Sequence, residues 1–168
     1  MTRKKWIALI VAAAVVVAAL AAVLFWPRAS IDETKNLIAN GGFEAASGSV
    51  PDNWAIGRWF WDEGVSYLSL SSDACSGSAS ICVENAAEND ARFEQTIAVE
   101  PNAYYRISCM VKAEGCQIER AGAGISLENT FVSSDSAYDT DGEWTRVTLY
   151  GKTGSNQKSM TVMCRVGG

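Results

Sequence analysis

Short runs in which apolar and polar residues alternate, each followed by turn-forming residues, restrict most strongly what the chain after its first 35 residues can fold into. A period of two places successive side chains on opposite faces of a β-strand. It predicts that Ile107, Cys109 and Val111 face a core while Ser108 and Met110 face away. No convincing helical period interrupts these runs, which favours an all-β domain.

Eight such runs are expected to form the strands of a β-sandwich, and in particular of a jelly roll. Clusters of Gly, Asn, Asp, Ser and Pro separate them, as turns require. The segment is long enough for one domain with one core. The expected strands are residues 36–39, 65–71, 79–84, 92–100, 103–113, 121–128, 144–152 and 159–166.

An unbroken apolar run precedes this domain, at residues 6–26, and contains only Ala, Val, Leu, Ile, Phe and Trp. At about 1.5 Å per residue it spans roughly the 30 Å hydrocarbon core, which predicts one transmembrane helix. Basic residues in 1–5 indicate a cytoplasmic tail, so residues 27–35 form a stalk and the domain at 36–168 is extracytoplasmic. A cleaved signal peptide is the alternative. We expect a single-pass protein of the cell membrane.

Charge excludes several classes of partner. Without the three basic residues of the tail, 11 Lys and Arg remain against 19 Asp and Glu, a net charge of −8. Nucleic acids and anionic lipids attract basic surfaces, so neither is an expected partner. The chain contains no histidine and no Cys-x-x-Cys pair, which gives zinc and thiol-redox sites little support.

Five cysteines leave at least one without an intrachain partner if the others form disulfides. Cys75 and Cys82 bracket six residues and are candidates for closing a small loop. The absence of histidine removes Ser-His and Cys-His nucleophile systems, and no acidic pair stands in a glycosidase motif. We therefore expect a binding module rather than an enzyme. The cysteines are Cys75, Cys82, Cys109, Cys116 and Cys164.

An ordered set of short motifs carries a family resemblance over residues 36 to about 166. They read NLIANGGFE, PDNW, SGSASICVE, a glutamine at Gln95, a proline at Pro101, YYRISCMVKA and EWTRVTLYGK. In this order they resemble the jelly-roll carbohydrate-binding modules of families four, nine and twenty-two. Cys75 replaces the usual histidine before Ser-Gly, and the usual closing strand is absent after Arg165. We expect a jelly roll that is incomplete at its C-terminal end and exposes an unpaired strand edge.

The resemblance implies sugar binding, which uses flat aromatic faces with a few polar groups. In an extended segment 57–67, Trp59 and Trp61 share one face and Phe60 takes the other. Trp54 and Trp144 match core-packing positions instead. For the two arginines on later strands, an ordinary surface charge is the alternative. The candidate carbohydrate-binding residues are Trp59, Trp61, Arg58, Tyr67, Arg106 and Arg165.

Glu44 is a candidate ligand for a structural calcium ion, because the resemblance places an acid of this role there. The alternative is a solvated or turn-capping carboxylate. Residues 139–143, DTDGE, begin like a calcium loop but lack its later acid, so we interpret them as a turn. Phe43 is expected in the core, after a tight turn that Gly41 and Gly42 permit.

The sequence therefore predicts a membrane-anchored, extracytoplasmic carbohydrate-binding module that recognises a polysaccharide or cell-wall glycan through exposed aromatic residues. The resemblance implies that such modules accompany glycoside hydrolases. The alternative, from another class, is an envelope protein-interaction or structural β-sandwich that binds no sugar. Exposure of Trp59 and Trp61 favours the first, and their burial favours the second.

Overall fold

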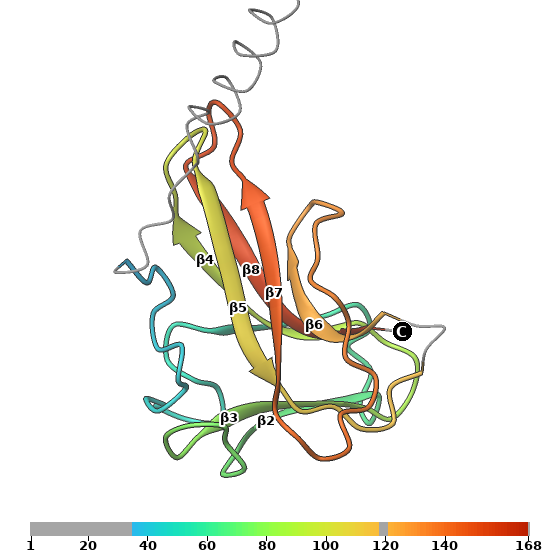
Figure 1. Ribbon diagram of the computed structural model, residues 1–168. Helices are drawn as coiled ribbons and strands as arrows, with labels where there is room; N and C mark the ends of the chain where they lie inside the picture. The colour runs from blue at the N-terminus through green and yellow to red at the C-terminus, as the bar shows by residue number, and fades with distance from the viewer. Residues whose placement is uncertain (1–34, 118–120, 168) are drawn as a thin grey trace, which may run out of the picture. The chain divides into compact units, whose positions relative to one another are not determined.

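The computed structural model describes residues 35–117 and 121–167, which belong to one compact unit. Within these residues the protein is all-β and has no helix (Figure 1). The strands are β1 (Ala55–Arg58), β2 (Ser66–Ser71), β3 (Ser80–Asn85), β4 (Ala91–Ala98), β5 (Tyr104–Val111), β6 (Gly122–Leu127), β7 (Thr145–Lys152) and β8 (Ser159–Gly167).

The strands form two layers around one core. One sheet has the order β1-β4-β8-β6, and its neighbours are all antiparallel. The pair β5-β7 covers one face of this sheet, and β2-β3 forms a second two-stranded sheet (Figure 1). This two-layered arrangement fits a β-sandwich. The buried core cluster consists of Ile97, Val99, Ile125, Leu127, Val147, Leu149, Met160 and Val162.

The strands confirm most of the alternation that the sequence predicts. Seven of the eight expected strands are present, with boundaries that shift by at most two residues. Ile107, Cys109 and Val111 pack against the core cluster, as predicted. Tyr105 also packs against it, while the neighbouring Tyr104 points outward and is 54% exposed. β1, which is only four residues long, was not among the strands expected from the sequence.

The prediction of a strand at residues 36–39 is wrong. The backbone of this segment pairs with the side chain of Gln95 and not with a neighbouring strand. The amide of Ala39 donates to Oε1 of Gln95 at 2.8 Å, and Nε2 of Gln95 donates back to the Ala39 carbonyl at 2.9 Å. Nε2 also donates to the Asn53 carbonyl at 3.0 Å. Gln95 is buried, so this one amide fastens the N-terminal segment to β4.

The turn after this segment also differs from the prediction. Positive φ occurs at Asn40 (50°) and Phe43 (61°), whereas neither Gly41 nor Gly42 adopts it. Asparagine tolerates this region because its side chain bonds locally, and here the Asn40 amide donates to two backbone carbonyls. Phe43 is half-buried outside the core cluster and packs on Trp54, with ring centroids 5.2 Å apart.

The predicted transmembrane helix at residues 6–26, the tail at 1–5 and almost all of the stalk lie outside the described residues. Within residues 35–117 and 121–167, no helix is long and apolar enough to span a bilayer.

Candidate functional site

Three adjacent aromatic side chains project into solvent directly after β1. Trp59, Phe60 and Trp61 are 73%, 50% and 65% exposed. β1 ends at Arg58 and residues 59–65 form a loop and turn, so the extended segment 57–67, on which the expected alternation of these rings depends, is a strand only as far as Arg58. All three side chains are exposed to solvent. We call residues 59–61 the aromatic loop.

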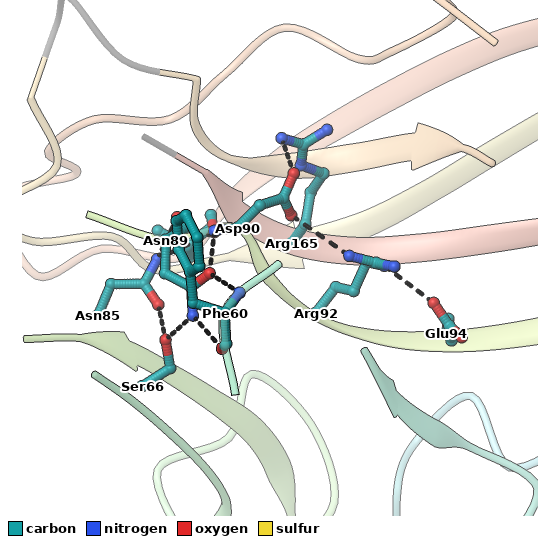
Figure 2. A network of polar contacts seen from close by, with 9 residues as sticks. Phe60, Ser66, Asn85, Asn89, Asp90, Arg92, Glu94 and Arg165 are labelled. Carbon is teal, nitrogen blue, oxygen red and sulfur yellow. Dashed lines mark hydrogen bonds and ion pairs between the residues drawn. The ribbon is translucent and has the colours of Figure 1, made fainter. Parts of the chain in front are cut away.

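Asn89 holds the backbone of the aromatic loop. Its Oδ1 accepts the Phe60 amide at 2.9 Å, and its Nδ2 donates to the Phe60 carbonyl at 3.0 Å (Figure 2). Nδ2 also donates to Oγ of Ser66 at 2.7 Å, and this hydroxyl contacts Oδ1 of Asn85 at 2.6 Å. Asn89 is only 3% exposed. The network fixes the backbone while the rings stay in solvent, a preorganised arrangement that reduces the entropy lost on binding.

A row of charged side chains lies next to the aromatic loop. The register places Gly57 of β1 beside Arg92 of β4, and Arg92 beside Arg165 of β8. Because Phe93 and Gln95 face the core, Arg92 and Glu94 lie on the opposite face of the sheet. The sheet thus brings together residues far apart in sequence.

Ion pairs join this row, which we call the charged row, with members Asp90, Arg92, Glu94 and Arg165. The Asp90 carboxylate bridges the two arginines: Oδ2 pairs with Nη2 of Arg165, and Oδ1 lies 3.9 Å from Nη1 of Arg92 (Figure 2). Nε of Arg92 donates to Oε2 of Glu94 at 2.9 Å. Each side chain is about one quarter exposed. Two cations and two anions cancel, so the row favours a neutral ligand over an anion.

Polar atoms without a hydrogen-bond partner occur on both faces of the sheet near the aromatic loop. Among the described residues, four buried side-chain nitrogen or oxygen atoms have no hydrogen-bond partner, and three of them are Nε of Arg58, Oδ1 of Asp90 and Nε of Arg165. A buried polar group without a partner costs about 1–3 kcal/mol, so folded proteins keep few of them. Asp90 and Arg165 belong to the charged row, whereas Arg58 lies opposite Ala91, whose side chain faces the core, and so lies on the other face of the sheet.

Arg58 supports one ring of the aromatic loop. Its Cζ lies 5.4 Å from the centroid of the Trp61 ring, a cation–π distance. The guanidinium therefore limits the orientations of Trp61. Tyr67, on β2, is 55% exposed, and its hydroxyl lies close to Gly64 in the turn that follows the aromatic loop.

The structure separates the remaining predicted residues. Arg165 belongs to the charged row, but Arg106 lies on β5 opposite Tyr150, in another sheet. Because Tyr105 and Ile107 pack inward, Arg106 points away from the core, so these two candidate carbohydrate-binding residues do not belong to one site. Trp54 is buried, as predicted, whereas Trp144 is half-buried with Nζ of Lys112 at 5.4 Å from its ring centroid.

Glu44 caps a loop. Its oxygens accept hydrogen bonds from the Ser78 amide at 2.9 Å, the Ser78 hydroxyl at 2.5 Å and the Ala79 amide at 3.3 Å. The bonds from Ser78 lower the pKa of Glu44 below its ordinary value. Within the described residues, no three His, Cys, Asp or Glu side chains gather as a metal cluster would. The carboxylate thus acts as a cap, and these side chains do not by themselves fit a calcium ion.

Sequence reasoning missed the residues that organise the site, namely Asn89, Asp90, Arg92 and Glu94. Arg92 and Glu94 stood in a predicted strand, where alternation could have placed both on the face opposite Phe93. Asn89 and Asp90 lie in the loop before β4 and gave no local signal. Their role depends on contacts with segments at residues 60 and 165.

Comparison with known proteins shows a distant similarity to a chitinase. The chain is 28% identical over 157 residues to Exochitinase 1 of Streptomyces olivaceoviridis. The match covers 89% of this chain but 24% of that protein, so the chain spans about a quarter of its length. No family model matches the chain.

Proposed function

We propose that this protein is a carbohydrate-binding module of the jelly-roll type that binds a polysaccharide through the aromatic loop and the charged row. The observation that carries the proposal is the joint exposure of Trp59, Phe60 and Trp61 on a backbone held by Asn89. Neighbouring exposed apolar rings form a patch, and exposed apolar patches often mark a binding site. Aromatic faces suit the C–H faces of sugar rings, and neighbouring polar groups bind the hydroxyls.

The charged row supports a neutral glycan, because its charges cancel. Chitin is the first polysaccharide to test, since the similar protein is named an exochitinase. A non-catalytic role fits a domain that corresponds to a quarter of that protein's length. Attachment to a membrane through residues 6–26, an extracytoplasmic location and a structural calcium ion near Glu44 belong to the same proposal. Backbone carbonyls would have to supply most of the ligands to calcium.

The test is affinity electrophoresis of the full chain in gels containing glycol chitin, xylan or a soluble β-glucan. We expect at least one glycan to retard the protein, and the double variant Trp59→Ala/Trp61→Ala to migrate freely. Phe131→Ala is the matched control, because Phe131 is fully exposed in another loop. Circular dichroism confirms that each variant folds. If no glycan retards the folded protein, the proposal fails.

A second candidate function is protein interaction, and the edges of two strands favour it. Within residues 35–117 and 121–167, β3 pairs with β2 alone and β5 with β7 alone. A cavity of about 540 Å³ is lined by Val83 and Glu84 of β3 and by Lys112 to Glu114, which follow β5. Unpaired strand edges accept an added strand. Light scattering that detects a stable oligomer or complex, together with no glycan binding, would favour this candidate.

A further inference from the structure

Two cysteines face each other from the two layers of the domain. Cys109 lies on β5 and packs against the core cluster. Cys164 lies on β8, opposite Phe93 of β4 and Ile125 of β6, which are both buried in the interior. Alternation therefore directs both side chains into the space between the layers. Both line the same cavity of about 200 Å³, and each thiol shifts the pKa of the other.

We propose that Cys109 and Cys164 are a disulfide-forming pair, which a small-molecule or protein disulfide oxidises to a covalent bond between the two layers. Each of the five cysteines lies within the described residues and is a free thiol in this structure. The facing pair is therefore the reduced form. A disulfide requires the sulfurs to move together to about 2.05 Å, and the cavity beside them leaves room for that movement.

The chemistry of the pair fits thiol–disulfide exchange. The neighbouring Cys164 lowers the pKa of the Cys109 thiol, whereas Cys109 and burial raise the pKa of Cys164, so Cys109 loses its proton more readily of the two. The Cys109 thiolate attacks a disulfide RSSR, forming a mixed disulfide and releasing one RS⁻. Cys164 then attacks the Cys109 sulfur, passes its proton to an RS⁻ and displaces the second thiolate. Two protein thiols are oxidised and one RSSR is reduced to two thiols.

The other cysteines are less suited to this partnership. Cys75 and Cys82 are exposed, and burial raises the pKa of Cys116, which lies after β5. Cys82 lines the same cavity as the pair, from β3, and is its direct competitor. Its exposure on the strand face that also carries Glu84 places its sulfur away from the interior. The geometry therefore favours Cys164 as the partner of Cys109.

The bond would change the stability of the domain. It would close a loop of about 55 residues, which restricts the unfolded chain strongly. For a domain of this size we expect the thermal midpoint to rise on the order of 10 °C after oxidation and to fall back in dithiothreitol. Cys164 directly precedes Arg165, so the bond would also fix β8 beneath the charged row.

The experiment treats the folded full chain with glutathione disulfide, blocks the remaining thiols in denaturant and maps the peptides without reduction. We expect one intrachain link, between the peptides that carry Cys109 and Cys164. The variant Cys75→Ser/Cys82→Ser/Cys116→Ser keeps only the proposed pair and should form the same link with the same rise in midpoint. Because Cys82 and Cys75 are exposed, Cys75→Ser/Cys82→Ser is a milder variant should the triple one not fold.

Two outcomes would overturn the proposal. One is a link between Cys82 and Cys109, or between Cys75 and Cys82, in the wild type in place of the proposed one. The other is full alkylation of Cys109 and Cys164 after oxidation of a chain whose circular dichroism is that of the folded protein.

Discussion

The backbone amide of Trp59 donates a hydrogen bond to the carbonyl of Asp90 at 2.9 Å. The same Asp90 bridges Arg92 and Arg165 through its carboxylate. One residue thus joins the aromatic loop to the charged row, and a displacement of either part is transmitted to the other through a single peptide unit.

Replacing Asn89 by alanine should release the aromatic loop. The variant loses both hydrogen bonds to the Phe60 backbone and the bond to Ser66, in a place that water does not reach. We expect the free energy of unfolding to fall by about 2–3 kcal/mol and glycan retardation to weaken. Urea unfolding and affinity electrophoresis measure the two effects. Asn156→Ala, in an exposed turn, is the control and should change neither.

Gly57→Ala should disturb the charged row while the protein stays folded. A Cβ at this position would lie 2.8 Å from Nε and Cζ of Arg92 and from Oε2 of Glu94, which are the mobile ends of two side chains. We expect the pair to move aside, at a cost within about 1 kcal/mol of stability, and glycan affinity to fall several-fold. Gly48→Ala meets nothing within 4 Å and serves as the control. Unchanged affinity in Gly57→Ala would mean that the charged row does not contact the ligand.

Gln95→Leu should loosen the N-terminal segment. The substitution keeps the size of the side chain but removes its three hydrogen bonds to the backbone of Ala39 and Asn53. We expect a loss of about 1–3 kcal/mol in the free energy of unfolding and faster proteolytic cleavage before β1. Limited proteolysis with mass spectrometry locates the cut. The control Gln157→Leu loses only exposed hydrogen bonds and should be cleaved as the wild type is.

Glu44 should stabilise the protein in a way that depends on pH. Its hydrogen bonds from Ser78 lower the folded-state pKa below the ordinary value of 4.5. The unfolded chain therefore binds the proton more readily, so the stabilisation is complete above about pH 4.5 and disappears as the pH falls through the folded-state pKa. We expect the difference in thermal midpoint between wild type and Glu44→Gln to be constant from pH 7 to pH 5 and to shrink toward pH 3. A difference that does not change with pH would contradict this account.

The local sequence pattern was enough to predict which side chains of a strand face inward and which face outward. The inward positions of Ile107, Cys109 and Val111 follow from period two, and so does the opposite orientation of Tyr104 and Tyr105. The exposure of Trp59 and Trp61 agrees with the charged residues around them in sequence. Each of these features depends on near neighbours in the chain.

The features that the sequence did not reveal depend on distant neighbours. Residues 36–39 have the composition of a strand, yet the partner that their backbone finds is the side chain of Gln95. Arg165 and Arg106 look alike in sequence, and the pairing of β8 with β4 rather than with β5 separates them. Asn89 stands in a loop that only the folded chain places beside Phe60.

The position of β8, between β4 and β6, also determines when the site can exist during synthesis. The ribosome releases the aromatic loop about a hundred residues before Arg165, the residue that completes the bridge through Asp90. Until β8 emerges, β4 and β6 have no strand between them and leave strand edges open. A nascent chain that ends before β8 lacks the bridge through Asp90, so it should not show the glycan binding proposed above.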